Sequence, residues 1–282
     1  MSLVQYSDSG SDSDSDAELP PPKRPRHIIQ PISDLPPLPP TFHDLYASST
    51  RVSVQDDPTL HGGRKRVTPH VEGNWPTHLY LEWYPSKEEL PLLKNLIPSQ
   101  SKDRAKNQVR IHSLLHSDLG AQLPLHISLS RSVVLRTEQR TLFMDSVQKA
   151  VEGSRIPPFN VIPDRLMWAP NHDRTRWFLV LHVQRPKENT LNALLWSSNR
   201  ALARVGQPPL YASSVDDASH QQDYSDNFHI SIAWTLTEPR AENTQYLTNI
   251  DLDPLQDLHI QFDCLKVKIG NNVTSIPLPM NM

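Results

Sequence analysis

The sequence predicts an α+β fold, with two pseudo-symmetric lobes of antiparallel sheet, helices packed outside them and an active-site groove between the lobes. Two observations support this prediction. Segments with the alternating hydrophobicity of strands are mixed with segments of helical periodicity, and no regular β-α-β rhythm connects them. The order of the segments also repeats approximately within the chain. A strand at 125–130 is followed by a helix, further strands and a second helix, and then by a comparable strand at 228–234.

The predicted strands are short segments of alternating apolar residues, bounded by polar residues, glycine or proline. The segment 176–184 is apolar almost throughout, which is typical of a strand in the middle of a sheet. Strands are expected at 77–84, 125–130, 159–168 (one or two short strands broken by Pro163), 176–184, 228–234, 258–269 (two alternating runs) and 273–278 (an edge strand).

Helices are predicted where apolar residues recur at helical spacing between start and stop signals. The clearest apolar stripe consists of Leu142, Phe143, Val147, Ala150 and Val151. Helices are expected at 137–153, with Gly153 as the stop, and at 190–205, with Gly206 as the end. A third helix is expected after a capping box formed by Ser86 and Glu89. Pro91 disfavours an unbroken helix there.

Residues 1–70 differ from the rest and are predicted to be a disordered, acidic and proline-rich tail. Nine of the 27 prolines lie within the first 40 residues, and such a segment cannot bury enough apolar surface to offset its ordering entropy. Residues 7–16 alternate serine with acid, typical of a kinase substrate or of a plain solvated leader. The basic cluster at 23–26 is a candidate nuclear-import signal, so we expect a nuclear protein.

Composition excludes several classes of protein. The single cysteine, Cys264, rules out a disulfide framework and a cysteine-based zinc cluster. No run of 18 apolar residues is present, so we expect no membrane span. The net charge is −3, and residues 71–282 are near neutral, which excludes a wide basic footprint for duplex nucleic acid. An RNA substrate would therefore be bound in a small cleft by a single-stranded end.

Two His-Ile-Ser triplets are the strongest functional signal in the sequence. They are centred on residues 126–128 and 229–231, and apolar residues flank both. Alternate residues of a strand face opposite sides of the sheet, so each triplet buries its isoleucine and presents its histidine and serine together. Of the 13 histidines, only His126 and His229 are followed two positions later by Ser or Thr. One triplet alone indicates an ordinary half-exposed strand, whereas the pair predicts an active site.

Two imidazoles and two hydroxyls suit the cleavage of a phosphodiester bond. Histidine titrates near neutrality, so one ring can act as base while the other acts as acid. The hydroxyls of Ser128 and Ser231 can donate to the non-bridging phosphate oxygens, where charge builds up. In RNA the ribose 2′-hydroxyl is the natural internal nucleophile. The histidines show no HExxH or other tight metal-ligand spacing, so no metal and no other cofactor are expected.

The triplets resemble those of the two-histidine (2H) phosphoesterase superfamily, which carries two His-x-Ser/Thr triplets about a hundred residues apart; here the histidines are 103 positions apart (229 − 126). Within it, the chain is most similar to the phosphodiesterases that process the 3′ end of U6 small nuclear RNA. The segments 73–80, 125–130 and 228–234 carry this likeness, which covers about residues 71–282. The resemblance therefore implies that residues 71–282 are one 2H phosphodiesterase domain.

The resemblance also implies roles for single residues. The family acts as a nuclear, metal-independent 3′→5′ exonuclease that trims oligouridine tails and leaves a 2′,3′-cyclic phosphate or a 3′-phosphate. By this likeness His126 is the base, His229 is the acid, and Ser128 and Ser231 hold the phosphate. The expected partner is the single-stranded 3′ end of U6 small nuclear RNA, bound by a monomer. The candidate substrate-binding residues are Tyr224, Asn227 and Arg131. Tyr224 is expected to lie in an exposed loop and to stack on a base, although it is one position nearer to His229 than in the family pattern.

Two other functions stay open at this point. One is another enzyme of the same superfamily, which opens 2′,3′-cyclic nucleotides. The other is a non-catalytic RNA-binding module that keeps the fold. The remaining histidines of the strand patterns, His78, His182 and His259, are expected to be structural.

Overall fold

The computed structural model describes residues 71–98, 110–212, 222–239, 245, 247 and 250–280. The predicted tail at 1–70, with its basic cluster, lies outside these residues. The chain divides into the units 1–39 and 40–282, and all that follows concerns the second unit. Within the described part, no helix has the length and apolar character needed to cross a membrane.

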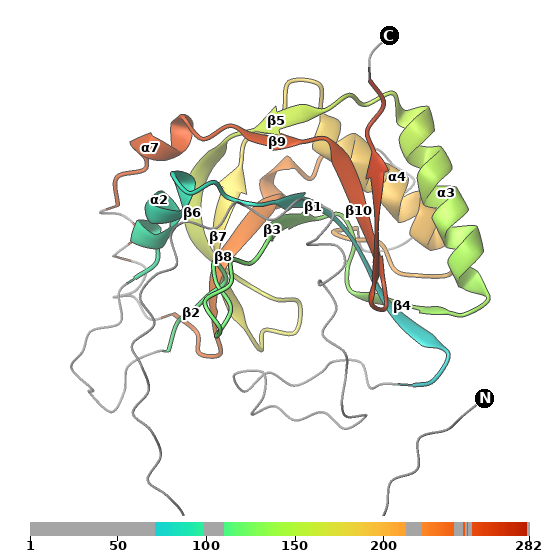
Figure 1. Ribbon diagram of the computed structural model, residues 1–282, viewed down its shortest axis with the longest axis horizontal. Helices are drawn as coiled ribbons and strands as arrows, with labels where there is room; N and C mark the ends of the chain where they lie inside the picture. The colour runs from blue at the N-terminus through green and yellow to red at the C-terminus, as the bar shows by residue number, and fades with distance from the viewer. Residues whose placement is uncertain are drawn as a thin grey trace, which may run out of the picture. The chain divides into compact units, whose positions relative to one another are not determined.

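Nine strands of the described residues form one sheet, and every pair of neighbours in it is antiparallel (Figure 1). The strands follow in the order β11 (Asn272–Pro277), β10 (Cys264–Ile269), β1 (Asn74–Trp83), β3 (Leu125–Ser128), β8 (His229–Thr235), β7 (Trp177–Val183) and β6 (Pro163–Pro170), with β4 (Val133–Arg136) beside β1 and β2 (His112–Ser113) beside β8. A separate two-stranded ladder consists of β5 (Phe159–Val161) and β9 (Ile260–Phe262). The predicted α+β class and the predicted edge strand are confirmed.

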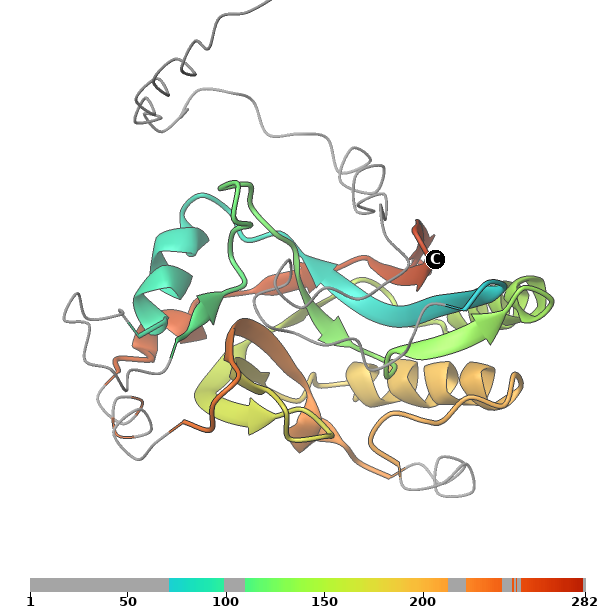
Figure 2. The same cartoon turned by 90° about the horizontal axis from the view of Figure 1, so that it is seen from below.

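The helices lie at two ends of the sheet. Helices α3 (Gln139–Ser154) and α4 (Thr190–Ala203) run side by side, as both views show (Figures 1 and 2). Their buried side chains belong to the same apolar core as the inward residues of β1, β3, β7 and β8. At the other end, α2 (Glu89–Leu96) lies beside the short helix α7 (Asp253–Gln256) (Figure 2). The core face of the sheet is thus covered, and functional side chains belong on its other face.

The sheet consists of two halves that meet at a seam between β3 and β8. The first half contains β11, β10, β1, β3 and β4, and the second contains β8, β7, β6 and β2. Between β3 and β8 the register holds a single pair, Ile127 opposite Ile230. The two predicted lobes correspond to these halves, which share one continuous core. The seam is the place predicted for an active-site groove.

Helix ends confirm one predicted signal and correct two others. Helix α2 has its capping box, because Glu89 Oε2 accepts from the Ser86 N–H at 2.6 Å and Ser86 Oγ accepts from the Glu89 N–H at 3.2 Å. Pro91 does not break this helix, since a first-turn residue needs no N–H. The predicted stop at Gly153 is one residue early: α3 ends at Ser154, and the C-cap residue Arg155 adopts a left-handed φ of 54°.

Two further predictions about the helices can be compared with the structure. Leu142 was expected in the apolar stripe of α3 but is 56% exposed, and Ala150 is only half-buried; the buried apolar side chains of this helix are Phe143, Val147 and Val151. The predicted end of α4 at residue 205 is two residues late: the helix ends at Ala203, and Gly206 lies in the turn that follows, where its N–H donates to the Ala203 carbonyl at 3.0 Å and its φ is 69°.

Candidate active site

The two His-Ile-Ser triplets lie side by side at the seam. Ile127 and Ile230 are directly opposite each other, and neither is exposed to solvent. Because side chains alternate between the two faces of a strand, the histidine and serine of both triplets project from the opposite face. We call this the site face, and it carries His126, Ser128, His229 and Ser231.

The register determines which of these four side chains are neighbours. With Ile127 opposite Ile230, the antiparallel register places His126 opposite Ser231 and Ser128 opposite His229. Directly opposite side chains have Cβ atoms roughly 5 Å apart, and diagonal ones roughly 7–8 Å apart. The imidazoles therefore occupy one diagonal and the hydroxyls the other, so that one phosphate between them can contact all four groups.

His229 is held by the backbone of a short 3-10 helix, η2 (Ser225–Asn227). Its Nδ1 donates a hydrogen bond of 2.6 Å to the Asn227 carbonyl oxygen, which also accepts from the Tyr211 hydroxyl at 2.9 Å. With Nδ1 engaged, Nε2 is the nitrogen that can exchange a proton with a substrate. Loss of hydration lowers the pKa of His229, the bond to Asn227 raises it and His182 lowers it, so that the pKa stays below its ordinary value.

His126 is held by aromatic rings. The ring centroids of His78 and Tyr80, both on β1, lie 5.4 and 5.5 Å from that of His126 in edge-to-face arrangements. Part of the His126 side chain is open to solvent. Even so, loss of hydration on the protein side, and secondly the nearby His229, lower the pKa of His126 to about 4. The ring is therefore neutral at pH 7 and can accept a proton.

His78 is a third histidine of the site face. Its Nε2 lies 3.2 Å from Oγ of Ser128. Burial, then His126 and Lys268, lower the pKa of His78 to about 3, while a hydrogen bond with the Ser130 backbone acts in the opposite sense. With its proton on Nε2, the neutral ring donates to Oγ of Ser128 and leaves the serine hydroxyl hydrogen for a phosphate oxygen. His78 was expected to be only structural, but it contacts Ser128, a predicted phosphate-binding residue.

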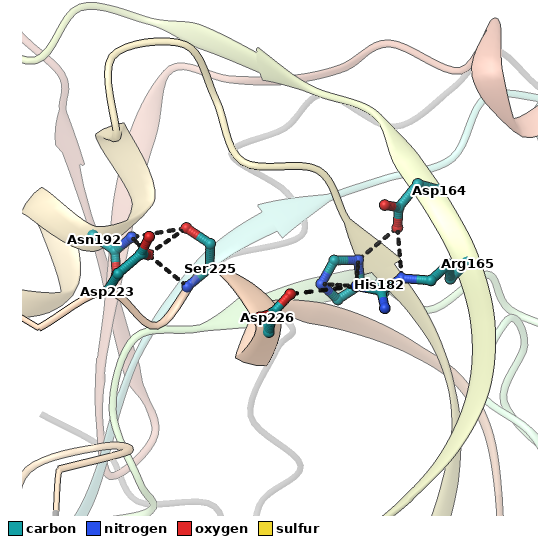
Figure 3. Close-up of polar contacts among 7 residues, drawn as sticks. All are labelled: Asp164, Arg165, His182, Asn192, Asp223, Ser225 and Asp226. Carbon is teal, nitrogen blue, oxygen red and sulfur yellow. Dashed lines mark hydrogen bonds and ion pairs between the residues drawn. The ribbon is translucent and has the colours of Figure 1, made fainter.

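A second polar cluster lies on the other side of His229, on β7 and β6 (Figure 3). His182 is opposite His229 in the β7–β8 register, and its Nδ1 is 2.5 Å from Oδ1 of Asp164. Arg165 places Nη2 3.0 Å from His182 Nε2 and 3.5 Å from Oδ1 of Asp226, a residue of η2. This cluster connects three elements around the second triplet, and the sequence did not predict it.

The chain before η2 is anchored to helix α4 (Figure 3). The buried Asn192 side chain donates to Oδ1 of Asp223 at 2.8 Å and to Oγ of Ser225 at 3.1 Å. Its Oδ1 accepts from the Tyr224 N–H at 2.9 Å. Asp223 also accepts from Arg185 Nη1 at 2.7 Å. These bonds determine the path of the backbone that leads into the second triplet.

The three predicted substrate-binding residues differ in their surroundings. Tyr224 is only 6% exposed, so the prediction of an exposed loop tyrosine is wrong, because the ring packs into the core at 6.0 Å from the ring of Tyr211. Asn227 is exposed and supplies the carbonyl that orients His229. Arg131 is partly buried in the turn after β3, with no polar partner for its guanidinium within the described residues.

Two further features lie outside the site face. Among the residues that the structure describes, no group of three or more His, Cys, Asp or Glu side chains could hold a metal ion. An apolar cavity of about 540 Å³ lies between α2 and α7, lined by residues that include Leu96, Ile250 and Leu255. It contains none of the polar groups described above, so the candidate site is the seam.

Comparison with known proteins identifies relatives over nearly the whole chain. A model of the HVSL family, described as an uncharacterised conserved protein, matches residues 36–277. A Neurospora crassa protein named U6 snRNA phosphodiesterase 1 is 36% identical over 292 residues, which cover 90% of this chain and 78% of that protein. The Homo sapiens protein of the same name is 28% identical over 287 residues and covers 98% of both chains.

Two solved structures share the fold. The structure of Kluyveromyces marxianus Usb1 has a TM-score of 0.51 at 17% identity and covers 73% of this chain and 98% of that one. The structure of the same protein with uridine monophosphate has a TM-score of 0.52, at 17% identity, and covers 73% of this chain and 99% of that one. At this identity the likeness concerns the arrangement of the strands and helices.

Proposed function

The chain belongs to the HVSL family, and from this premise we propose that it is a metal-independent 3′→5′ RNA exonuclease that trims the oligouridine 3′ end of U6 small nuclear RNA. The relatives named U6 snRNA phosphodiesterase 1 are RNA phosphodiesterases, and their likeness extends over most of the chain. The observation that carries the proposal is the convergence of two His-Ile-Ser triplets on one face of the sheet, at a single register pair.

In the proposed reaction His126 acts as the base. Neutral at pH 7, its ring takes the proton from the 2′-hydroxyl of the penultimate ribose. The 2′-oxygen then attacks the adjacent phosphorus, and the bond between phosphorus and the 5′-oxygen of the terminal nucleoside breaks. His229, oriented by its bond to Asn227, donates a proton from Nε2 to that leaving oxygen.

The two serines act on the phosphate in this proposal. Ser128 and Ser231 occupy the other diagonal of the site and donate to the non-bridging oxygens as negative charge develops on them. The direct product is an RNA ending in a 2′,3′-cyclic phosphate and a free terminal nucleoside. Attack by water on this cyclic phosphate, with the roles of the two histidines exchanged, gives a 3′-phosphate.

The remaining parts of the proposal concern the setting of the enzyme. The uridine monophosphate in the structure of the Kluyveromyces protein supports a uridine-containing 3′ end as the ligand here. We place the enzyme in the nucleus as a monomer, with residues 1–70 as a disordered tail carrying the import signal at 23–26. Asn227 and Arg131 remain proposed contacts to the terminal nucleotides, whereas the buried Tyr224 does not.

The test is to incubate the full chain with uridine-ended and adenosine-ended oligonucleotides in EDTA and to measure the shortened ends by mass spectrometry. We expect stepwise shortening of the uridine-ended RNA and a terminal mass that corresponds to a cyclic phosphate or a 3′-phosphate. Hydrolysis of free 2′,3′-cyclic nucleotides without shortening would favour the other type of 2H enzyme. RNA binding without turnover, unchanged by His126→Ala or His229→Ala, would favour a binding module.

A further inference from the structure

The two halves of the site face differ in charge. In the half that contains His229, the carboxylates of Asp164 and Asp226 share the single guanidinium of Arg165, at 3.6 and 3.5 Å (Figure 3). His182 lies among them and is opposite His229. An RNA phosphate placed on this side would meet two carboxylates, so this half suits an uncharged group better than a further phosphate.

The half that contains His126 carries cations instead. Strand β10 is paired with β1, with Lys266 opposite Tyr80 and Lys268 opposite His78. Since Tyr80 and His78 project from the site face beside His126, the two lysines project from the same face.

The two lysines are not equivalent. Lys266 is 7% exposed, and its Nζ lies 3.4 Å from Oε2 of Glu82 and donates to Oγ of Ser275 at 2.8 Å. Its charge is therefore already neutralised within the protein. Lys268 is only half-buried, and it has no anionic partner within the described ranges. It is close enough to His78 to disfavour protonation of that ring and so lower its pKa. Arg136, opposite Asn74 on the neighbouring β4, adds a second cation further along the same face.

We propose that Lys268 binds the phosphate immediately 5′ of the scissile phosphate, so that the RNA backbone runs from the seam across β1 toward β10. This inference rests on the proposed exonuclease function. The base must face the penultimate ribose and the acid must face the terminal nucleoside. Upstream RNA therefore lies on the side of His126, and the nucleoside that leaves in the first cleavage, which carries no further phosphate, lies on the acidic side of His229.

The dimensions of the sheet agree with this path. Lys268 lies two strands across from β3, about 10 Å at the usual spacing, and two residues further along than Ser128, about 7 Å, so that the two backbones are roughly 12 Å apart at these residues. Phosphates of one strand are about 3.4 Å apart along the axis of a stacked helix and further apart in an extended strand. A lysine with a flexible four-carbon stem at this position can therefore reach the next phosphate upstream without displacing the scissile phosphate from the triplets.

The test combines a protein variant with a change in the RNA. The protein variant is Lys268→Gln, which keeps a polar side chain one atom shorter than lysine but removes its charge. The RNA is a pentauridylate with a 2′-deoxy sugar at the penultimate position, which removes the nucleophile and allows binding to be measured without cleavage. In a second RNA the phosphate 5′ of the scissile one is replaced by an uncharged methylphosphonate, and both RNAs carry the same 2′-O-methyl group beside it for stability.

We expect Lys268→Gln to raise the Kd for the charged RNA about fivefold and to leave the Kd for the methylphosphonate RNA unchanged. The salt dependence should change as well, with the slope of log Kd against log salt falling by about 0.7 for the lost phosphate contact. Lys149→Gln, at an exposed position on α3, is the matched control and should change neither Kd.

An equal effect of Lys268→Gln on both RNAs, or no effect on either, would overturn the proposal. The binding cycle is also independent of turnover. If the unsubstituted chain released no terminal nucleoside from a plain oligouridylate, the proposed exonuclease function would fail, whereas the assignment of Lys268 would still be decided by the two Kd values.

Discussion

The two triplets have the same sequence but different surroundings. His229 has one nitrogen bonded at 2.6 Å to the carbonyl of Asn227, two residues before it, while His126 is enclosed by the rings of His78 and Tyr80. Within the described residues no hydrogen bond of the His126 ring is found. The two triplets have the same sequence, but contacts with neighbouring elements give their histidines different chemical environments.

This inequality fits a division of labour between base and acid. A base has to be neutral before the reaction, and the pKa of about 4 keeps His126 so. An acid has to present its proton in a defined direction, and the bond at Nδ1 of His229 leaves Nε2 as the donor. The predictions below separate the two triplets experimentally, beginning with the largest expected effect.

The first prediction concerns the two histidines directly. His126→Ala and His229→Ala should each lower the single-turnover rate on oligouridylate by roughly 10²–10⁴-fold. A substrate with sulfur in place of the leaving 5′-oxygen releases a thiolate, which needs no proton. On this substrate the His229→Ala variant should regain most of its rate, whereas His126→Ala should not. Rescue of His126→Ala instead would exchange the two roles.

The second prediction concerns Ser128 and the histidine that contacts it. Ser128→Ala should lower the rate about 10²-fold, by analogy with the loss of one donor to a developing oxyanion. His78→Leu should lower it about tenfold, because the hydroxyl loses its partner at 3.2 Å. His78→Gln, with an amide near the position of Nε2, should keep most of the rate.

A double variant separates positioning from a general loss of structure. If His78 acts through Ser128, adding His78→Leu to Ser128→Ala should change the rate no further. Multiplied effects would show that His78 acts by another route. Within the described residues no histidine is hydrogen-bonded to Ser231, and combining Ser231→Ala with His78→Leu should therefore give multiplied effects.

The third prediction concerns pH. In the free enzyme the base must be deprotonated, so kcat/KM should rise as the pH passes about 4. The acid must be protonated, so kcat/KM should fall as the pH passes the pKa of His229, which lies below the ordinary 6.5. A bell-shaped profile with its maximum on the acid side of 6.5 is expected. His182→Gln should move only the descending limb, to higher pH, because His182 lowers the pKa of His229; movement of the ascending limb would contradict this.

The fourth prediction concerns Asn192, whose hydrogen bonds hold the backbone that leads into the second triplet. Asn192→Ala leaves the Tyr224 N–H and Asp223 without their buried partner and should lower the free energy of unfolding by about 1–3 kcal/mol. Because the backbone leading to His229 is loosened, kcat should also fall severalfold, as measured by single-turnover kinetics. Asn171→Ala, which breaks comparable bonds in the β6–β7 turn, should leave kcat unchanged.

Most of the fold could be predicted because strands of period two and helical stripes are visible in short windows of sequence. Strands β1, β3 and β8 were expected from alternation and β7 from its continuous apolar run, and all four lie within three residues of the expected bounds; the largest difference is at β1, which begins at Asn74 and not at residue 77. The end of α3 could not be predicted, because nothing in the local sequence marks Arg155 as a residue that adopts a left-handed conformation. The continuity of the sheet was also hidden, since the pairing of Ile127 with Ile230 joins segments that are distant in the chain.

The candidate site shows the same limit. The four triplet residues could be found because each pair lies within one strand. His78 carried a signal, since it is on the polar side of an alternating strand, but the sequence does not say that β1 is the neighbour of β3. Tyr224 was misjudged because its burial depends on Asn192 of a helix and on Tyr211 of another loop. Tertiary contacts of this kind leave no periodic pattern.

The seam has a consequence for how this protein can evolve. A slip of β3 by one residue along β8 would turn Ile127 outward and His126 and Ser128 into the core, and a slip of β8 would do the same to Ile230, His229 and Ser231. Selection for solubility and selection for turnover therefore act on the same register. Inherited variation should accumulate at the outer strands β6 and β11, while Ile127 and Ile230 tolerate only side chains of similar shape.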